Sequence, residues 1–392
     1  MSEFKIRKLT DRAGTGAPNF THGFNINGSD SGLTVFTHTV GTTEPSNPSN
    51  GDTWWNTDND SYNVYIDGEW KGWLGDTHSD VSYFGDRAHW ASGGRQHPSP
   101  SGVTTEIDYW DITSLGNAAD FGDITGSGTT GGSCASDATK IYFLGSGTTT
   151  TQIDFWTSAT LGNAADFGDT LTASGSPRAA AANGTRCLYH INYANGSNST
   201  NIVEQFACGT AGVTGSDFGD LTVSRWISTT ANSGVRCVFM SGQDSSYARQ
   251  NVLDYFTFAT AGNATDFGDL SLSRVNGAGA GSNETARGLY MGGYISPNDG
   301  GSSGYNNIDY ITIDTPGNGT DHGDLIQDTY GTGACANGSR ACTAGGLGST
   351  SPTYIRTNVI QYTALTTPGN AADFGDLQQA KHSGGSASGA AS

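Results

Sequence analysis

The octet Gly-Asn-Ala-Ala-Asp-Phe-Gly-Asp occupies residues 116–123 and returns unchanged at residues 162–169. Its last three residues, or a close variant, stand six times in the 392-residue chain, as Phe121-Gly122-Asp123, Phe167-Gly168-Asp169, Phe218-Gly219-Asp220, Phe267-Gly268-Asp269, His322-Gly323-Asp324 and Phe374-Gly375-Asp376. Self-similarity at a regular spacing is the sequence signature of a repeat architecture. The octet therefore predicts six copies of one structural unit.

Two further markers recur in the same order within each unit. A basic residue opens a short apolar run at Arg87, Lys140, Arg186, Arg236, Arg287 and Arg340, with spacings of 53, 46, 50, 51 and 53 residues. An apolar–acid–aromatic segment follows, at Ile107-Asp108-Tyr109, Ile153-Asp154-Phe155, Leu253-Asp254-Tyr255 and Ile308-Asp309-Tyr310, and in looser form at Val203 and Ile360. A period of about fifty residues is typical of kelch-type propeller blades.

The composition favours short strands joined by turns. Glycine accounts for 58 residues and charged side chains for only 14% of the chain, whereas charged residues average about 25% in soluble proteins. Each unit divides into four short strands, and the Asn-Gly pairs at 183–184 and 337–338 fall between the first and second strand. A two-residue hairpin needs positive φ at that point. We therefore expect an all-β fold.

The two ends of the repeat region are out of phase. The first unit begins at its second strand, around 87–94, and nothing before it resembles a first strand. The segment 377–392 is a first strand without a following unit. Pairing this segment with the residues around His89 and Trp90 completes six blades and removes the open edge of the array. The sequence thus predicts a six-bladed β-propeller over residues 76–392, closed by its C-terminal strand.

Three features resemble a kelch blade over roughly residues 80–392. They are paired glycines after the second strand, the acid–aromatic third strand, and a basic residue on the next first strand, as at Arg225, Arg274 and Lys381. The chain departs from kelch because Phe replaces the usual outer-strand Trp. The repeated octets also resemble those of virion structural proteins of marine tailed bacteriophages, especially cyanophages. This resemblance implies a virion structural protein that is assembled in the cytoplasm of the host.

Residues 1–75 carry none of the repeat markers, and we expect them to form a separate, small β-rich module. The first twelve residues carry a net charge of +2, which leaves −21 for the rest of the chain, and a Trp-rich hairpin follows. A module of this size is too small for a generous core, so it is expected to gain stability by docking or by forming a homo-oligomer. We predict that it attaches the protein to the tail or capsid of a virion. The residues expected to make this attachment are Lys5, Arg7, Lys8, Arg12, Trp54, Trp55 and Trp70.

The chain is strongly acidic, with 18 basic and 37 acidic residues and a net charge of −19. Such a surface repels phosphate backbones, so nucleic acid is not expected as a partner. No apolar run approaches the about 18 residues of a membrane span, and the N-terminus lacks the apolar stretch of a signal peptide. We therefore expect neither membrane insertion nor secretion. The six cysteines show no C-x-x-C pair and are interpreted as free thiols in a core.

Candidate metal and catalytic residues have simpler structural interpretations. Asp pairs such as Asp120 with Asp123 could bind calcium, but an Asp that bonds local N–H groups, a Gly with positive φ and a Phe wedged between blades explain the motif. Residues 56–60 together with Asp67 have a spacing that superficially resembles a helix–loop–helix calcium loop. Ser61 stands at the position where such a loop needs Gly, which argues against calcium binding. The eight histidines form no catalytic spacing. We expect no metal, no cofactor and no enzymatic activity.

The segments that join the second and third strands differ between units. In a propeller they project from one face, and variation there is where binding is expected. Tyr and Arg side chains stack on and hydrogen-bond to sugar rings or protein surfaces, although the same segments are equally compatible with solvated loops. The candidate ligand-binding residues are His97, Tyr193, Tyr247, Arg249, Tyr294, Tyr305, Tyr354 and Arg356.

These features favour a non-enzymatic virion structural protein that displays its propeller outward, as a tail fibre or a head decoration. Its partners would be other virion proteins and a glycan or receptor on the host surface. Two alternatives stay open. One is a propeller scaffold that binds a partner protein, and the other is a glycan-cleaving enzyme that uses paired carboxylates.

Overall fold

The computed structural model describes residues 38–56, 61–66, 68–72, 84–95, 102–145, 150–174, 179–192, 194, 199–282, 286–295, 304–348 and 355–391. Within these ranges every regular element is a β-strand, so the predicted all-β class is confirmed. None of these residues lies in a helix long and apolar enough to cross a bilayer. The chain divides into two compact units, Met1–Thr77 and His78–Ser392.

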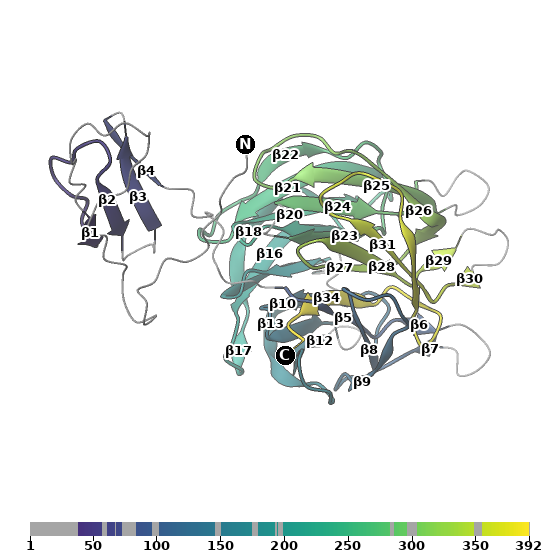
Figure 1. The fold of residues 1–392 in the computed structure, drawn as a ribbon. Helices are drawn as coiled ribbons and strands as arrows, with labels where there is room; N and C mark the ends of the chain where they lie inside the picture. The colour runs from purple at the N-terminus through teal and green to yellow at the C-terminus, as the bar shows by residue number, and fades with distance from the viewer. Residues whose placement is uncertain are drawn as a thin grey trace. The chain divides into compact units, whose positions relative to one another are not determined.

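The first unit contains one four-stranded sheet made of β1 (His38–Gly41), β2 (Thr53–Asn56), β3 (Ser61–Ile66) and β4 (Glu69–Gly72), as Figure 1 shows. The β1–β2 pair is parallel and the other two pairs are antiparallel. The ring of Trp54 lies 5.8 Å from that of Trp70, which lies 5.3 Å from that of Tyr65, both edge to face. Trp54 is only 7% exposed and donates from Nε1 to the Gly41 carbonyl at 2.9 Å. Two of the three tryptophans predicted to attach the protein therefore pack within this sheet.

Six sheets in the second unit repeat one strand order (Figure 1). The first sheet is β34 (Gly385–Gly389), β5 (Arg87–Ala91), β8 (Glu106–Asp111) and β9 (Ala119–Asp123), and the second is β10 (Ser133–Ser136), β11 (Lys140–Leu144), β12 (Thr150–Thr157) and β13 (Ala165–Ser174). The third is β14 (Ala180–Ala182), β15 (Arg186–His190), β16 (Thr200–Ala207) and β18 (Ser216–Arg225), and the fourth is β19 (Thr229–Asn232), β20 (Arg236–Gln243), β21 (Arg249–Thr257) and β22 (Thr265–Asp269). The fifth is β23 (Ala278–Ser282), β24 (Arg287–Met291), β25 (Tyr305–Thr312) and β26 (Thr320–Tyr330), and the sixth is β27 (Gly333–Ala336), β28 (Arg340–Ala344), β31 (Val359–Ala364) and β32 (Ala372–Asp376). All neighbouring strands within these sets are antiparallel.

Short additional strands extend this pattern. β17 (Val213–Thr214) pairs in parallel with β13, and β29 (Leu347–Gly348) with β30 (Ile355–Arg356) continues the fifth sheet beyond β26. A separate three-stranded sheet consists of β33 (Lys381–His382), β6 (Gly94–Arg95) and β7 (Gly102–Val103). In that sheet a segment near the C-terminus is again hydrogen-bonded to one near the start of the unit.

The predicted pairing of the C-terminal strand with the segment around His89 is confirmed. β34 and β5 are antiparallel, with Ser386 opposite Trp90 and Ala387 opposite His89. The Ser386 hydroxyl also donates to the His89 carbonyl at 2.8 Å. The last strand of the chain thus supplies the first strand of the first sheet, so that β5 has a partner on both sides.

The apolar core is divided into six clusters, and each cluster joins two neighbouring sheets. Five of them join sheets that are consecutive along the chain, and the sixth packs Trp90 and Trp110 of the first sheet against Cys335 and Cys342 of the sixth. The first strands of the sheets are likewise in contact in the order β34, β10, β14, β19, β23, β27 and back to β34. Every sheet is therefore covered on both faces by other sheets.

The repeated octet connects one sheet to the next. In all six copies the Gly of Phe/His-Gly-Asp has a φ between 139° and 155°, and a Cβ at Gly122 would collide with the carbonyl of Gly162 in the second sheet. Phe121 also packs against Trp156 of that sheet, as the wedge interpretation predicts. The Asp123 side chain, predicted to bond local N–H groups, accepts from the Thr105 hydroxyl at 2.7 Å. The Asp123 backbone N–H donates to Asn163 Oδ1 of the next octet at 3.1 Å, a contact that was not predicted. The same bond runs from the sixth sheet to the first, where the Asp376 N–H donates to Asn117 at 3.0 Å.

The basic residue that opens each second strand makes a second kind of contact between sheets. Arg87 donates to the Ser158 and Ala159 carbonyls in the second sheet, at 3.0 and 2.9 Å. Arg340 of the sixth sheet donates in the same way to the carbonyls of Ile112 and Thr113 in the first sheet, both at 3.0 Å. These side chains are part of the framework.

The Asn-Gly connections differ in detail from the expected two-residue hairpins. Three residues separate β14 from β15 and β27 from β28. The Asn337 side chain closes its connection by accepting from the N–H groups of Ser339 and Arg340 at 3.0 and 2.8 Å. The side-chain oxygen of Asn therefore supplies the closing acceptor that a tighter backbone turn would otherwise provide.

Candidate functional site

The acids of the third strands form a buried row with one member in each sheet. The residues at this position are Asp108, Asp154, Glu204, Asp254, Asp309 and the neutral Gln361, and all are 1% exposed or less. A buried carboxylate is costly unless it is paired or hydrogen-bonded. Each of these acids therefore needs a cation or hydrogen-bond donors within its own sheet or a neighbouring one.

Three of the buried acids are paired with a cation that precedes the first strand of the same sheet. Arg225 Nη1 lies 2.7 Å from Asp254 Oδ2, Arg274 Nη2 lies 3.0 Å from Asp309 Oδ2, and Lys381 Nζ lies 2.9 Å from Asp108 Oδ2. All six side chains are fully buried. The sequence analysis singled out these basic residues and acids separately but did not pair them.

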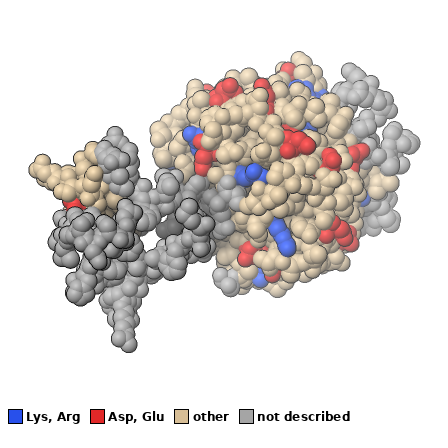
Figure 2. All heavy atoms as spheres, turned by 45° about the horizontal axis from the view of Figure 1, so that its top comes forward, with Lys and Arg blue, Asp and Glu red and all other residues tan. Residues whose placement is uncertain are grey.

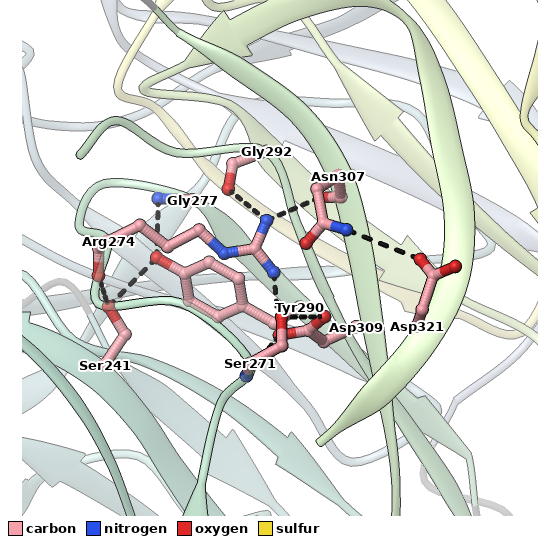
Figure 3. A network of polar contacts seen from close by, with 9 residues as sticks. All are labelled: Ser241, Ser271, Arg274, Gly277, Tyr290, Gly292, Asn307, Asp309 and Asp321. Carbon is pink, nitrogen blue, oxygen red and sulfur yellow. Dashed lines mark hydrogen bonds and ion pairs between the residues drawn. The ribbon is translucent and has the colours of Figure 1, made fainter.

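Figure 3 shows how the fifth sheet satisfies its buried pair. Arg274 donates from Nη1 to the carbonyls of Gly292 and Asn307, at 3.2 and 2.6 Å. Its guanidinium carbon lies 4.8 Å from the centre of the Tyr290 ring, and Asp309 accepts from the Ser271 hydroxyl at 2.7 Å. The network is closed over by protein, which is typical of a structural role and not of a binding surface.

Burial dominates the electrostatics of this row. It raises the pKa of Asp108, although Lys381 opposes the shift, and it lowers the pKa of Arg225, although Asp254 opposes that shift. Asp154 pairs with no cation among the residues that the structure describes. Burial raises its pKa, and the bonds it accepts from the Thr125 N–H at 2.9 Å and hydroxyl at 2.6 Å act in the opposite direction.

Two Ser–His contacts have the distance of a nucleophile and its base. Ser158 Oγ lies 2.9 Å from His89 Nε2, and Ser228 Oγ lies 2.9 Å from His190 Nδ1. Burial lowers the pKa of both histidines to about 3, and the four side chains are 0–2% exposed. A substrate cannot reach these groups as they lie, so the contacts are best explained as packing of polar groups between sheets.

Neither the acids nor the interior provide a ligand cavity. No group of three or more His, Cys, Asp or Glu residues that could hold a metal ion lies within the described ranges. All six cysteines are free, and five of them are buried. A cavity among the first strands, lined by residues such as Ser133, Thr230 and Asn276, has a volume of about 70 Å³, well below the about 300 Å³ of small-molecule sites.

The outer surface carries a more informative feature, a cluster of aromatic and basic side chains on the fourth and fifth sheets. We call Trp226, Tyr247, Arg249, Tyr294 and Tyr330 the aromatic–arginine cluster. The ring centroids of Trp226 and Tyr247 are 5.9 Å apart, and those of Tyr294 and Tyr330 are 5.1 Å apart. The Arg249 guanidinium lies 4.8 Å from the centre of the Tyr294 ring. Three of the eight predicted ligand-binding residues are therefore brought together.

Short backbone bridges hold the members of the cluster in place. Trp226 pairs with Gln243 at the end of β20, and Tyr294 pairs with both Val275 and Gly304. The connection between β20 and β21 is a compact loop in which Asp244 Oδ1 accepts from the N–H groups of Ser246 and Ala248, at 2.8 and 3.0 Å. Tyr247 stands at the tip of this loop with 55% of its surface exposed. The cluster thus has a fixed frame and one open aromatic side chain.

The other predicted binding residues are dispersed or lie outside the described ranges. His97, Tyr193 and Tyr354 fall outside them, as do Lys5, Arg7, Lys8, Arg12 and the proposed calcium-loop residues 57–60 and 67. Tyr305 begins β25 and its N–H donates to the Gly293 carbonyl at 2.7 Å, and Arg356 ends β30. Trp55 is half-buried in β2.

Trp226 and Tyr330 were not predicted from the sequence, because the prediction covered only the segments between second and third strands. Both residues instead lie where a fourth strand leads into the next first strand. A signal was present, since Trp226 follows Arg225 directly, whereas the equivalent Arg274 and Lys381 are followed by Val275 and His382.

Charged side chains make up only 14% of the sequence. On the face drawn in Figure 2, acidic and basic side chains are interspersed among uncharged residues.

No known protein family model matches the chain, and no curated protein is significantly similar to it in sequence. Function must therefore be inferred from the residues themselves.

Proposed function

We propose that the six sheets are the blades of one kelch-like β-propeller, closed by the pairing of β34 with β5. The support is that the contacts between neighbouring sheets also connect the sixth sheet to the first. This holds for the apolar clusters and for the contacts between first strands. It also holds for the octet hydrogen bond from Asp376 to Asn117 and for the Arg340 contacts. A linear array would leave the first and sixth sheets uncovered on one face each.

Within this architecture the protein is a non-enzymatic virion structural protein. The N-terminal module, residues 1–75, anchors it to the tail or the capsid, and the propeller is displayed outward to recognise a glycan or receptor on the host surface. The virion location rests on the resemblance of the repeated octets to those of phage structural proteins. The recognition role rests on the aromatic–arginine cluster.

The cluster carries this proposal because, within the described ranges, it does not recur from sheet to sheet as the framework contacts do. Framework contacts recur from sheet to sheet, whereas Trp226, Tyr247 and Arg249 come together once and expose an aromatic ring. Tyr, Trp and Arg are enriched at the centres of binding surfaces, where flat rings and a forked cation give contact area at low entropic cost. A recognition surface explains this departure from the repeat.

The test uses the full-length protein and intact particles. Immunogold labelling of mature virions with antibodies against the propeller is expected to decorate the particle surface, and purified protein is expected to bind host cells and compete with adsorption. A matched variant with Tyr247→Ala and Arg249→Gln should lose cell binding while keeping the parent melting temperature. Absence from particles, with recovery of a cellular protein partner, would instead establish an intracellular scaffold. Release of sugar from host polysaccharide would establish the glycan-cleaving enzyme.

A further inference from the structure

We propose that the aromatic–arginine cluster binds an anionic saccharide, with the acid group on Arg249 and a sugar face on Tyr247. This inference rests on the proposed recognition function and assigns its ligand class. Three independent features of the described residues lead to it, namely the electrostatic state of Arg249, unsatisfied donors in the cluster, and the backbone of Tyr247.

Arg249 is a cation without a carboxylate in a chain of net charge −19. The buried Arg225 and Arg274 each have an acid within 3.0 Å, whereas Arg249 forms no ion pair with any described residue. Its Nη1 donates to the Tyr247 carbonyl, and its flat face lies on Tyr294. Because Nη1 is occupied, the edge formed by Nε and Nη2 remains to bind a ligand. That edge matches the two oxygens of a carboxylate or a sulfate.

Two donors of the cluster are shielded from solvent and have no acceptor among the described residues. They are Nε of Arg249 and Nε1 of Trp226. Buried donors are almost always satisfied in proteins, so both of these donors are available to an acceptor that a ligand brings. The oxygen-rich edge of an acidic sugar supplies acceptors for both.

Tyr247 supplies the aromatic platform and the means of opening the site. Its φ is 65°, in the left-handed region that a non-Gly residue adopts only where the surroundings hold it, and such strain gathers at ligand sites. Its ring covers Trp226 edge-on, and 55% of its surface is exposed. Its apolar face offers a surface for the C–H groups of a pyranose, and under this proposal movement of the exposed loop tip gives the ligand access to the Trp226 and Arg249 donors.

The experiment is a glycan array probed with the full-length protein, with matched triplets of each oligosaccharide: neutral or methyl-esterified, carboxylated, and sulfated. We expect binding to acidic members only, weakened by salt as an exposed charge contact should be. The carboxylated and sulfated arms decide which acid is preferred. Intrinsic fluorescence should change on binding, and the change should shrink in Trp226→Phe.

Matched variants separate the site from the rest of the propeller. Arg249→Gln is expected to weaken binding of the acidic member by about tenfold or more, as loss of a charged bidentate contact implies, and Tyr247→Ala should act similarly. Lys140→Gln, at a basic residue of the second sheet whose Nζ donates to the Gly209 carbonyl at 2.9 Å, lies outside the cluster and should change affinity by less than about twofold. Equal binding of neutral and acidic members, binding of no glycan, or an unaffected Arg249→Gln variant would each overturn the assignment. If the protein still binds host cells in that event, recognition survives and only the ligand class is wrong.

Discussion

Removing the charge of Asp254 is the sharpest test of how the buried row holds the second unit together. The substitution Asp254→Asn keeps the shape of the side chain and an oxygen that can still accept from the Thr222 hydroxyl, now 2.6 Å away. It removes the carboxylate that lies 2.7 Å from Arg225, where both side chains are fully buried. The remaining bond of Arg225 to the Phe239 carbonyl, at 3.2 Å, cannot neutralise the guanidinium.

The expected cost follows from the burial of the orphaned cation. Breaking a buried pair by removing one partner typically costs about 3–5 kcal/mol, because the other charge stays uncompensated. For a unit of this size a loss of that order lowers the melting temperature by roughly 5–10 °C. Scanning calorimetry of the full-length protein at pH 7 measures the shift, and Arg225→Met combined with Asp254→Leu should recover part of it by removing both charges.

Asp154→Asn is the matched control, because Asp154 occupies the same position in the second sheet without a cation. The sixth sheet already carries an amide there, and Gln361 Oε1 accepts from the Ile326 N–H at 2.7 Å. We expect a change within about 1 kcal/mol at neutral pH. Since burial raises the pKa of Asp154 above its ordinary value of 3.8, the folded state keeps a proton that the unfolded chain releases, and stability contributed by this group falls as pH rises above 3.8. The variant should lack that fall. A loss in Asp254→Asn no larger than in Asp154→Asn would refute the reasoning.

Three further predictions concern other parts of the framework. Burial lowers the pKa of His190 from 6.5 to about 3, so only the unfolded chain gains a proton at this residue as the pH falls below 6.5. The free energy of unfolding therefore decreases by about 2 kcal/mol at pH 5. His190→Gln should flatten the decline of the melting temperature between pH 6.5 and 4.5, and parallel curves for the two proteins would contradict this. Gly122→Ala should destabilise the protein by about 3 kcal/mol because of the positive φ and the collision with Gly162. Gly116→Ala, with open space around the new Cβ, should not. Equal shifts in melting temperature would show that the close contact between Gly122 and Gly162 does not constrain the sheets. A chain that ends at residue 380 lacks β34, so one edge of β5 is unpaired. It should elute as aggregates in size-exclusion chromatography. An unchanged monodisperse peak would show that the pairing of β34 with β5 is dispensable.

The sequence predicted the framework well because the framework is repetitive. The Gly with a positive φ recurs in all six copies of the motif. An Asn that accepts from the preceding sheet recurs in five of them, and Val213 stands at that position in the third unit. Counting reveals a constraint that recurs so often. The position of the C-terminal strand followed from the same phase argument, and its partners His89 and Trp90 were correct. Contacts that depend on side-chain direction were not predictable. An example is the bond from the Asp123 N–H to the Asn163 side-chain oxygen, where the Asp side chain itself was expected to bond the N–H groups.

The aromatic–arginine cluster was only partly predictable, for the opposite reason. Tyr247, Arg249 and Tyr294 were found because they lie in variable connections, but their contact with Trp226 and Tyr330 depends on how a fourth strand enters the next sheet. Periodicity carries no information about a residue that occurs once. Proximity in three dimensions is what turned a list of scattered polar and aromatic residues into a cluster.

This contrast between repeated and unrepeated residues also bears on how the protein can change without losing its fold. The octet contacts, apolar clusters and arginine contacts are distributed over the six sheets, so that no single sheet must carry the stability of the whole second unit. A connection between a second and a third strand contributes little to those contacts, and residues there are free to vary. Tyr247 and Tyr294 of the cluster lie in such connections, and backbone bridges at Trp226 and Tyr294 hold its frame. Substitution of Tyr247 and Arg249 should therefore alter ligand choice with little effect on stability, whereas substitution of Asp254 should do the reverse. A shared loss of both properties in either variant would show that recognition and framework are not separable.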